Sequence, residues 1–401
     1  MGTIGCDRVW VEVNLDAIRT NMSQMQAHLA EGGKLAGVVK ADAYGHGAVP
    51  VAYAIDPFVC MYAVATVEEG VELRRNKITK PILILGQVAR SRYAEVLHYD
   101  LELPLFEVEA ARQLEEEAKK QQTCAKVHLA VDTGMSRIGF AVTEEAAEEA
   151  RQIAALPKLR IAGMFTHFAR ADERDKESAR KQYEAFLHFW WLLKERGVEI
   201  PLLHCANSAA ILELPEMHMD VARAGIAMYG LYPSDEMQRD AIALLPAMEW
   251  KSRVSYVKSI PAGTPISYGG TFVAEREMRI ATLPFGYADG YPRSASQKEE
   301  VLIHGKRVPL LGRICMDQCM ADVTELGDVK EGTLVTLVGR DGEEEITMEE
   351  LAERSGGFHY ELCCGVGKRV PRRYWENGRL VGVQTSLSKF VWSKTSSFCI
   401  D

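Results

Sequence analysis

The side chains best suited to chemistry stand at the ends of short apolar runs. Lys40 follows the run 35–39 and precedes the turn residues 44–47. A lysine at the end of a buried strand is costly unless its amine has a partner or a task. From this stretch alone two interpretations are equally open, a catalytic amine or a lysine whose ammonium group reaches solvent.

Further polar side chains follow later apolar runs, and they are Arg137, His167, Ser208 and Arg223. Taken singly, ordinary structural roles are favoured: a surface ion pair for Arg137, a core histidine for His167 and a helix N-cap for Ser208. If these residues and Lys40 lie on one rim of a sheet, they bring together an amine, two guanidinium groups and an imidazole. A helix start that suits phosphate lies beside them.

The elements that must position these groups alternate between strand and helix. Eight strand-like runs lie at 35–39, 62–65, 81–85, 101–105, 126–131, 160–165, 202–205 and 219–222. The clearest helix spans 177–196, with apolar residues at Tyr183, Phe186, Leu187, Trp190 and Leu193. Eight such repeats predict an α/β fold, a (β/α)8 barrel over residues 1–240, with an open doubly wound sheet as the alternative.

A cofactor follows from this placement. In a barrel the functional groups gather at the carboxyl ends of the strands, and the loops after strands seven and eight often bind phosphate. Pyridoxal 5'-phosphate (PLP) needs both a lysine for its aldehyde and a phosphate cradle. The residues therefore predict a PLP barrel in which Lys40 forms the Schiff base.

The sequence pattern changes after about residue 234, where the helical spacing of apolar residues mostly disappears. Short strand-like runs follow at 250–260, 279–283, 301–303, 320–323 and 334–338, with one helix at 348–354. We expect a β-rich second domain over 241–385 and a flexible tail over 386–401.

Composition excludes several classes of function. The 401 residues are 47% hydrophobic and 26% charged, with a net charge of −9 and no basic tract, so we expect neither nucleic-acid nor membrane binding. Nine cysteines are scattered without metal-ligand or disulfide spacing. No apolar signal-peptide segment occurs in residues 1–13. These features indicate a cytoplasmic protein without a bound metal.

Several segments together resemble the alanine racemase family over about residues 7–385. They are 39–47 (VKADAYGHG), 132–139 (DTGMSRIG), 223–230 (RAGIAMYG), 267–269 (SYG), 286–290 (GYADG) and 312–317 (GRICMD). The first and the last are highly specific. The resemblance implies a PLP-dependent isomerase, with a barrel and a C-terminal β-domain, that interconverts L-alanine and D-alanine.

The resemblance also implies a role for each matching residue. Lys40 and Tyr268 are the two acid/base groups, with Tyr268 reaching the partner's site in a head-to-tail homodimer. The residues implied to bind the cofactor are Lys40, Tyr44, His167, Ser208, Arg223, Gly225 and Ile226. The residues implied to meet the substrate are Arg137, Met316 and Tyr287, the last two supplied by the partner subunit.

The chemistry implied by these roles is coherent. Lysine and tyrosine both have reference pKa values of about 10. Their surroundings must lower these pKa values for the two groups to act at neutral pH. In the family, His167 and Arg223 link to Tyr268, and the positive charge favours tyrosinate. Arg223 also faces the pyridine nitrogen and cannot give up its proton. The nitrogen should stay unprotonated, so no more than trace pyruvate should form.

Two positions depart from the family pattern. Ala130 stands where many members carry a carbamylated lysine that orients the arginine equivalent to Arg137. Lys368 stands where some members carry a tyrosine beside the phosphate, and it either adds charge there or points to solvent. A change at that position could alter acceptance of a larger side chain, so a serine or broad-specificity racemase is the alternative.

Two other PLP proteins use similar architectures. Decarboxylases of basic amino acids combine a barrel with a β-domain, but segments 267–269 and 315–317 argue against that activity. PLP homeostasis proteins lack a second domain, so residues 241 onward argue against that class.

Overall fold

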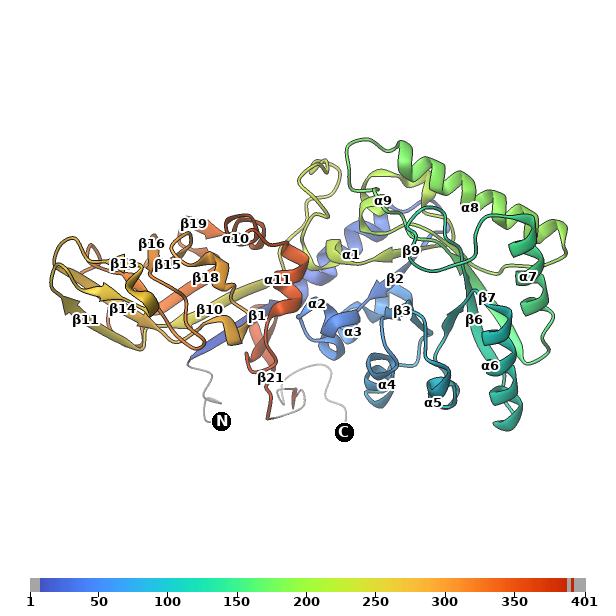
Figure 1. Ribbon diagram of the computed structural model, residues 1–401, viewed down its shortest axis with the longest axis horizontal. Helices are drawn as coiled ribbons and strands as arrows, with labels where there is room; N and C mark the ends of the chain where they lie inside the picture. The colour runs from blue at the N-terminus through green and yellow to red at the C-terminus, as the bar shows by residue number, and fades with distance from the viewer. Residues whose placement is uncertain (1–7, 388–390, 393–401) are drawn as a thin grey trace. The chain divides into compact units, whose positions relative to one another are not determined.

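The computed structural model describes residues 8–387 and 391–392, and Figure 1 shows its ribbon. The chain divides into two compact units. The first contains Ala17–Ala43 and Ala48–Leu245, and the second contains Tyr44–Gly47 with the described parts of Met1–Asp16 and Pro246–Asp401. The described residues before Ala17 and the short segment Tyr44–Gly47 thus group with the C-terminal unit.

Eight parallel strands form the wall of the first unit, and each coincides with one of the apolar runs. They are β2 (Lys34–Val38), β3 (Val59–Val64), β4 (Ile82–Ile84), β5 (Leu103–Leu105), β6 (Ala125–Ala130), β7 (Leu159–Phe165), β8 (Leu203–His204) and β9 (Val221–Ala224). They pair in the orders β4-β3-β2-β9 and β5-β6-β7-β8.

Backbone hydrogen bonds join these two sheets on both sides. The Ile84 N–H donates to the Glu102 carbonyl at 2.9 Å, and the Arg223 N–H donates to the Ala206 carbonyl at 3.0 Å. The wall therefore closes on itself, which confirms the predicted barrel and excludes the open sheet.

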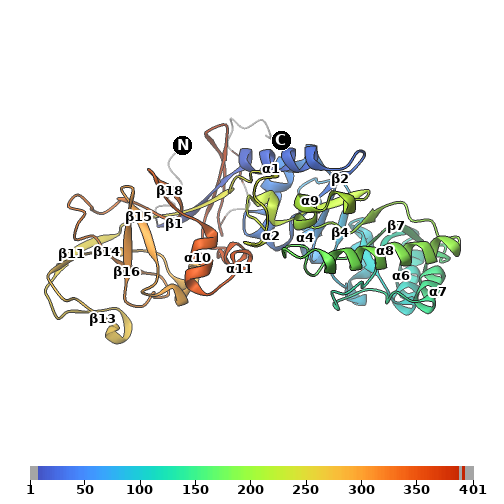
Figure 2. The same ribbon diagram turned by 90° about the horizontal axis from the view of Figure 1, so that it is seen from above.

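Helices surround this wall, as Figures 1 and 2 show. They are α3 (Ala48–Ile55), α4 (Val67–Arg75), α5 (Tyr93–His98), α6 (Val108–Lys120), α7 (Glu144–Ala154), α8 (Glu177–Glu195) and α9 (Ser208–Glu213). Strands covered by helices on one side and packed inside the barrel on the other are buried on both faces, which accounts for their continuous apolar sequences.

Helix α8 matches its predicted span, and its buried face only partly follows the apolar positions of the sequence. Phe186 and Leu193 are buried as expected, whereas Phe189 and Gln182 are buried in place of other expected positions. The Gln182 side chain accepts from the Ala169 N–H at 2.9 Å and donates to the His167 carbonyl at 3.1 Å. A polar residue with these partners can be buried, and simple apolar periodicity does not count it.

The second unit is built on one large sheet. Its strands are β1 (Val9–Asn14), β10 (Met248–Arg253), β11 (Tyr256–Ile260), β14 (Met278–Leu283), β15 (Glu300–Ile303), β16 (Lys306–Leu311), β17 (Cys319–Asp322), β18 (Leu334–Asp341), β19 (Glu344–Ile346), β20 (Arg372–Glu376), β21 (Arg379–Gln384) and β22 (Val391–Trp392). A separate two-stranded ribbon contains β12 (Pro265–Ile266) and β13 (Phe272–Val273).

Two parts of this sheet come from unexpected stretches of sequence. Strand β1 lies between β10 and β20, antiparallel to the first and parallel to the second. Strand β22 falls inside the expected flexible tail 386–401 and pairs with β21. Residues 388–390 and 393–401 of that tail lie outside the described residues.

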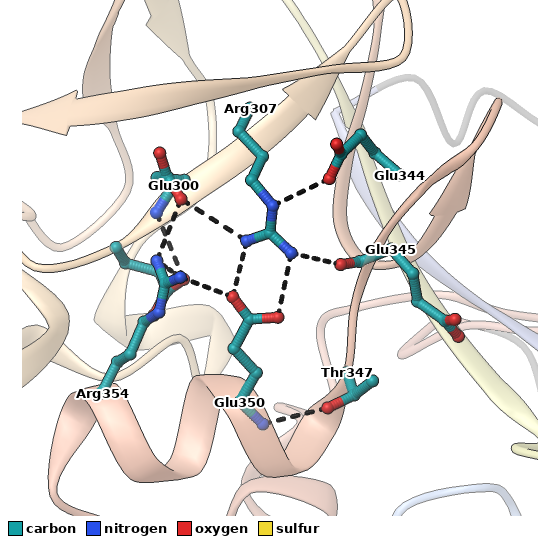
Figure 3. A network of polar contacts seen from close by, with 8 residues as sticks. Glu300, Arg307, Glu344, Glu345, Thr347, Glu350 and Arg354 are labelled. Carbon is teal, nitrogen blue, oxygen red and sulfur yellow. Dashed lines mark hydrogen bonds and ion pairs between the residues drawn. The ribbon is translucent and has the colours of Figure 1, made fainter.

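A network of ion pairs fastens α10 (Met348–Ser355) to the sheet (Figure 3). Arg307 on β16 contacts Glu350 at 2.6 Å and Glu344 at 2.9 Å. Arg354 contacts the same Glu350 at 2.7 Å and Glu300 on β15 at 3.1 Å. Because each arginine bridges several carboxylates, the network contributes more to the stability of the fold than the same number of isolated surface ion pairs would.

Candidate active site

Lys40 stands at the carboxyl end of β2, half-buried, where a left-handed turn begins. Ala41, Asp42 and Ala43 have φ of 52°, 52° and 53°, and Tyr44 continues at 52°. Left-handed residues other than glycine cost about 1–2 kcal/mol each. Gly45 and Gly47 follow with φ of 80° and 98°, so the left-handed path includes the turn residues 44–47 but starts earlier, at Ala41.

Two carboxylates stabilise that turn. The Ala41 N–H donates to Glu69 Oε1 at 2.6 Å, and the Ala48 N–H donates to Asp42 Oδ1 at 2.7 Å. Glu69 also accepts from the Ala65 N–H at 2.7 Å and completes the capping box of α4. Glu69 thus links the ends of β2 and β3 beside Lys40. The spacing Thr66-x-x-Glu69 indicates a capping box, but its reach to Ala41 is visible only in the structure.

Arg223 is a buried guanidinium on β9 with a full set of acceptors. It donates to the carbonyl oxygens of Thr166 at 2.8 Å, His204 at 2.9 Å and Cys205 at 3.1 Å. Burial lowers the pKa of Arg223 to about 10. It is therefore still a cation at neutral pH, held in one orientation near the carboxyl ends of β7 and β8.

His167 follows β7 and accepts from Arg223. Its Nδ1 lies 3.2 Å from the Arg223 guanidinium, and because arginine can only donate, the His167 proton resides on Nε2. Burial, together with the charges of Arg223, Arg137 and Lys40, lowers the pKa of His167 to about 3. Those three cations act on one imidazole, so the structure brings these four predicted residues to one rim.

Ser208 joins the starts of two short helices. Its Oγ accepts from the Gly225 N–H at 3.0 Å and the Ala227 N–H at 3.3 Å, which ties α9 to the 3-10 turn η4 (Ile226–Tyr229). Asn207 caps α9 through the Ala210 N–H at 3.1 Å. A hydroxyl group among converging N–H groups is the donor set that a phosphate requires. These residues therefore fit the phosphate of PLP.

Arg137 lies in the exposed loop after β6. Asp132 shapes this loop by accepting from the N–H groups of Gly134 and Ser136, both at 3.0 Å. Within the described chain Arg137 has no hydrogen-bond or ion-pair partner. Ala130 is buried at the end of β6 and offers no group to hold the guanidinium, so Arg137 is available to a ligand carboxylate.

Tyr44 belongs to the second unit, where it packs against α11 (His359–Gly365). Its ring lies 6.1 Å from that of Tyr360. Burial, and secondarily the Cys364 thiol, raise the pKa of the Tyr44 phenol, so it stays protonated and can donate a hydrogen bond. Lys368 is exposed.

Tyr268, Tyr287 and Met316 lie on adjoining loops of the second unit. They are 71%, 41% and 51% exposed. The loops are joined because Ser267 Oγ donates to the Arg313 carbonyl at 2.6 Å and the Tyr287 N–H donates to the Cys315 carbonyl at 3.1 Å. Large exposed aromatic and apolar side chains that cluster in this way are typical of a surface that meets a partner.

A buried carboxylate holds two of these loops together. Asp289 accepts from the Gly286 N–H at 3.0 Å and pairs with Arg8 and, at 2.8 Å, with Arg369. Arg369 also contacts Asp317 at 2.5 Å, one residue after Met316. Arg369 therefore clamps the Tyr287 loop to the Met316 loop, a role that its sequence neighbours do not reveal.

No group of three histidine, cysteine, aspartate or glutamate side chains among the described residues is arranged to hold a metal ion. Among the helices of the same residues, none is long and apolar enough to cross a bilayer.

Comparisons with known proteins point to the same family over almost the whole chain. Residues 13–233 match the model for the alanine racemase N-terminal domain, and residues 247–374 match the model for the C-terminal domain. The chain is 44% identical to an alanine racemase of Clostridium novyi over 378 residues, covering 94% of this chain and 97% of the relative. It is likewise 44% identical to one of Desulforamulus reducens, covering 91% and 98%.

Solved structures agree as well. An alanine racemase of Clostridium difficile superposes with a TM-score of 0.91 at 40% identity, covering 95% of this chain and 99% of the other. The Bacillus anthracis alanine racemase with bound L-Ala-P gives 0.91 at 38% identity, covering 95% and 98%. With both domain models matched and relatives alike over nearly their full length, this chain belongs to the alanine racemase family.

Proposed function

We propose that this protein is a PLP-dependent alanine racemase that interconverts L-alanine and D-alanine. The observation that carries the proposal is the contact of the buried Arg223 with His167 at the rim that also bears Lys40 and the Ser208 cradle. The family membership supports the same reaction, and the relatives' names favour alanine over the serine or broad-specificity alternative.

Residues of this chain would hold each part of the cofactor. Lys40 would hold the aldehyde carbon, Ser208 with the backbone of Gly225 and Ile226 would bind the phosphate, and Tyr44 would donate a further hydrogen bond to it. Arg223 would face the ring nitrogen with a proton that it does not release. The chemistry supplied by bound PLP is electron withdrawal from Cα, which acidifies the Cα proton.

Proton transfer then needs two groups on opposite faces of Cα. Lys40 Nζ would take or deliver the proton on one face, and Tyr268 of the partner subunit would do so on the other. The His167 Nε2–H is a suitable donor to the oxygen of that phenolate. Because the two groups act from opposite sides, the substrate can be inverted without being turned.

The substrate carboxylate needs a cation and a donor. Arg137 would supply the guanidinium, and the Met316 N–H of the partner subunit would supply a second hydrogen bond. Tyr287 of the partner subunit would line the approach and limit the size of the side chain. The exposure of the loops that carry Tyr268, Tyr287 and Met316 supports their use in a head-to-tail homodimer with composite active sites.

A cytoplasmic location is part of the proposal. The described cysteines Cys60, Cys124, Cys205, Cys315, Cys319 and Cys363 carry free thiols, which suits a reducing compartment.

The test of this proposal is a chirality assay on the purified protein. With PLP bound, as shown by its visible absorbance, L-alanine should yield D-alanine until the two are equal, and L-serine should react far more slowly. Lys40→Ala should abolish both the absorbance of the lysine adduct and the activity. A protein that retains PLP but leaves L-alanine unchanged would refute the proposed function.

A further inference from the structure

A chain of hydrogen bonds leads away from Arg223 into the barrel. The Arg223 guanidinium lies 3.1 Å from His204 Nδ1. His204 Nε2 lies 2.9 Å from His128 Nδ1, and His128 Nε2 lies 2.8 Å from Glu102 Oε2. All four side chains are buried. The chain starts at the residue before β5 and crosses β6 and β8 to reach β9.

Only one arrangement of protons satisfies the three contacts. Arginine has donors and no acceptor, so His204 Nδ1 must accept. His204 then donates from Nε2 to His128 Nδ1, and His128 donates from Nε2 to Glu102. Neither imidazole can carry a second proton without losing an acceptor in the chain. Burial lowers the pKa of His204 well below its usual value, in keeping with a neutral ring.

This arrangement joins a buried cation to a buried anion through two neutral rings. Among the described residues no carboxylate contacts Arg223 directly; its other partners are carbonyl oxygens and imidazole nitrogens. A buried guanidinium is costly without a compensating anion. Glu102 supplies one at the end of the chain, and an ionised end polarises each hydrogen bond toward itself and strengthens it.

We propose that Glu102, His128 and His204 are positioning residues that fix the orientation and the proton of Arg223. The inference rests on the proposed racemase function, in which Arg223 faces the ring nitrogen of the cofactor. One nitrogen of the guanidinium contacts His204, and another donates to His167. The chain of hydrogen bonds therefore also helps to orient the His167 ring and its Nε2–H.

The first variant removes the charge but keeps an acceptor. Glu102→Gln still accepts from His128 through its amide oxygen, whereas the anion is lost. We expect kcat for alanine to fall about tenfold with little change in KM, as happens when a partner behind a catalytic group is lost. We also expect more pyruvate per racemisation event, because Arg223 is then less firmly kept as a cation.

Glu115→Gln is the matched control. Glu115 is also a buried carboxylate of the barrel unit, but it pairs with Lys119 on α6 and lies outside the chain. It should leave kcat and pyruvate yield unchanged. Equal losses in both variants would reduce Glu102 to a structural role and overturn the proposal.

A second pair of variants tests the hydrogen bonds themselves. His128→Gln can accept from His204 with its oxygen and donate to Glu102 with its nitrogen, so it preserves the direction of the chain. His128→Leu interrupts it. We expect His128→Gln to retain most of the activity and His128→Leu to resemble or exceed Glu102→Gln. Identical behaviour of the two would overturn the proposal.

Nuclear magnetic resonance of the protein without cofactor gives a readout independent of activity. Selective nitrogen labelling of histidine should show His128 and His204 as neutral Nε2–H tautomers with strongly hydrogen-bonded protons. Glu102→Gln should shift both resonances and Glu115→Gln neither. Unchanged resonances in Glu102→Gln would show that the proposed chain of hydrogen bonds does not exist. If the shifts occur in a protein that does not racemise alanine, the chain of hydrogen bonds is supported and the proposed function fails.

Discussion

Arg223 donates to His167 Nδ1 at 3.2 Å within the barrel rim. This single contact fixes which nitrogen of His167 carries the proton, because the guanidinium has no acceptor to offer in return. The same arginine is held by three carbonyl oxygens, so the guanidinium cannot turn without breaking several hydrogen bonds.

Arg223→Lys should raise the yield of pyruvate, the by-product of racemisation. A lysine cannot bond to His167 and His204 in the same geometry, and its ammonium group releases a proton at least about a hundredfold more readily than a guanidinium in the same environment. We expect pyruvate formed per racemisation event to rise about tenfold, as measured by coupled reduction of pyruvate. Arg74→Lys is the control, since Arg74 also donates to backbone carbonyls in the same unit. A trace yield in Arg223→Lys would contradict this role.

His167 should make stability depend on pH below neutrality. Its pKa is lowered to about 3 in the folded protein, whereas an unfolded histidine titrates near 6.5. Between these values the unfolded chain binds one more proton, so the unfolding free energy of the barrel falls by up to about 1.4 kcal/mol per pH unit as the pH drops from 6.5 toward 3. Above pH 6.5 this dependence should vanish.

Urea unfolding at several pH values checks that dependence, with His167→Gln as the reference. The glutamine variant should lose less stability between pH 6 and pH 5 than the unmodified protein does. Parallel pH profiles for the two proteins would mean that His167 titrates normally in the folded state.

Glu69→Gln should weaken the left-handed turn after Lys40. An amide cannot accept from Ala41 on one atom and from Ala65 on the other, as the carboxylate does. We expect a loss of about 1–2 kcal/mol in unfolding free energy, together with weaker PLP retention. Glu68→Gln is the neighbouring control, since Glu68 is exposed and forms its ion pair with Arg92, away from Ala41 and Ala65. If both variants bind PLP as the parent does, Glu69 does not position Lys40.

Arg369→Lys should loosen the loops that carry Tyr287 and Met316. A lysine cannot bridge Asp289 and Asp317 as the guanidinium does. Because these loops are proposed to contact the substrate, we expect KM for alanine to rise about threefold to tenfold while PLP affinity stays the same. Arg340→Lys, at an exposed pair with Glu345, should leave KM unchanged. An unaltered KM in Arg369→Lys would show that the clamp is not needed.

The barrel was predictable because its eight strands are buried on both faces and so stand out as apolar runs between helices. Strand β1 was not, since its partners β10 and β20 are remote in sequence, and an isolated run of alternating residues does not say which sheet it joins. The turn after Lys40 was missed for a related reason. Ala41 and Ala43 have no preference for positive φ, and the contacts that Glu69 and Asp42 make with this turn depend on the fold.

The predicted site residues of the barrel were recoverable because strand ends are identifiable and a barrel brings those ends together. Residues that act behind them, such as Gln182, Glu102 and His128, lie on ordinary helical and strand positions. Their roles depend on side-chain contacts across the barrel, which neither spacing nor composition encodes.

Subunit mixing tests the central claim, a site that combines Lys40 of one subunit with Tyr268 of the other. Lys40→Ala and Tyr268→Ala should each be inactive as pure homodimers. After equal mixing and subunit exchange, half of the dimers are mixed and each has one intact site, so D-alanine formation should return to about a quarter of the unmodified rate. No recovery, with exchange verified by mass spectrometry of differently tagged subunits, would contradict the composite site.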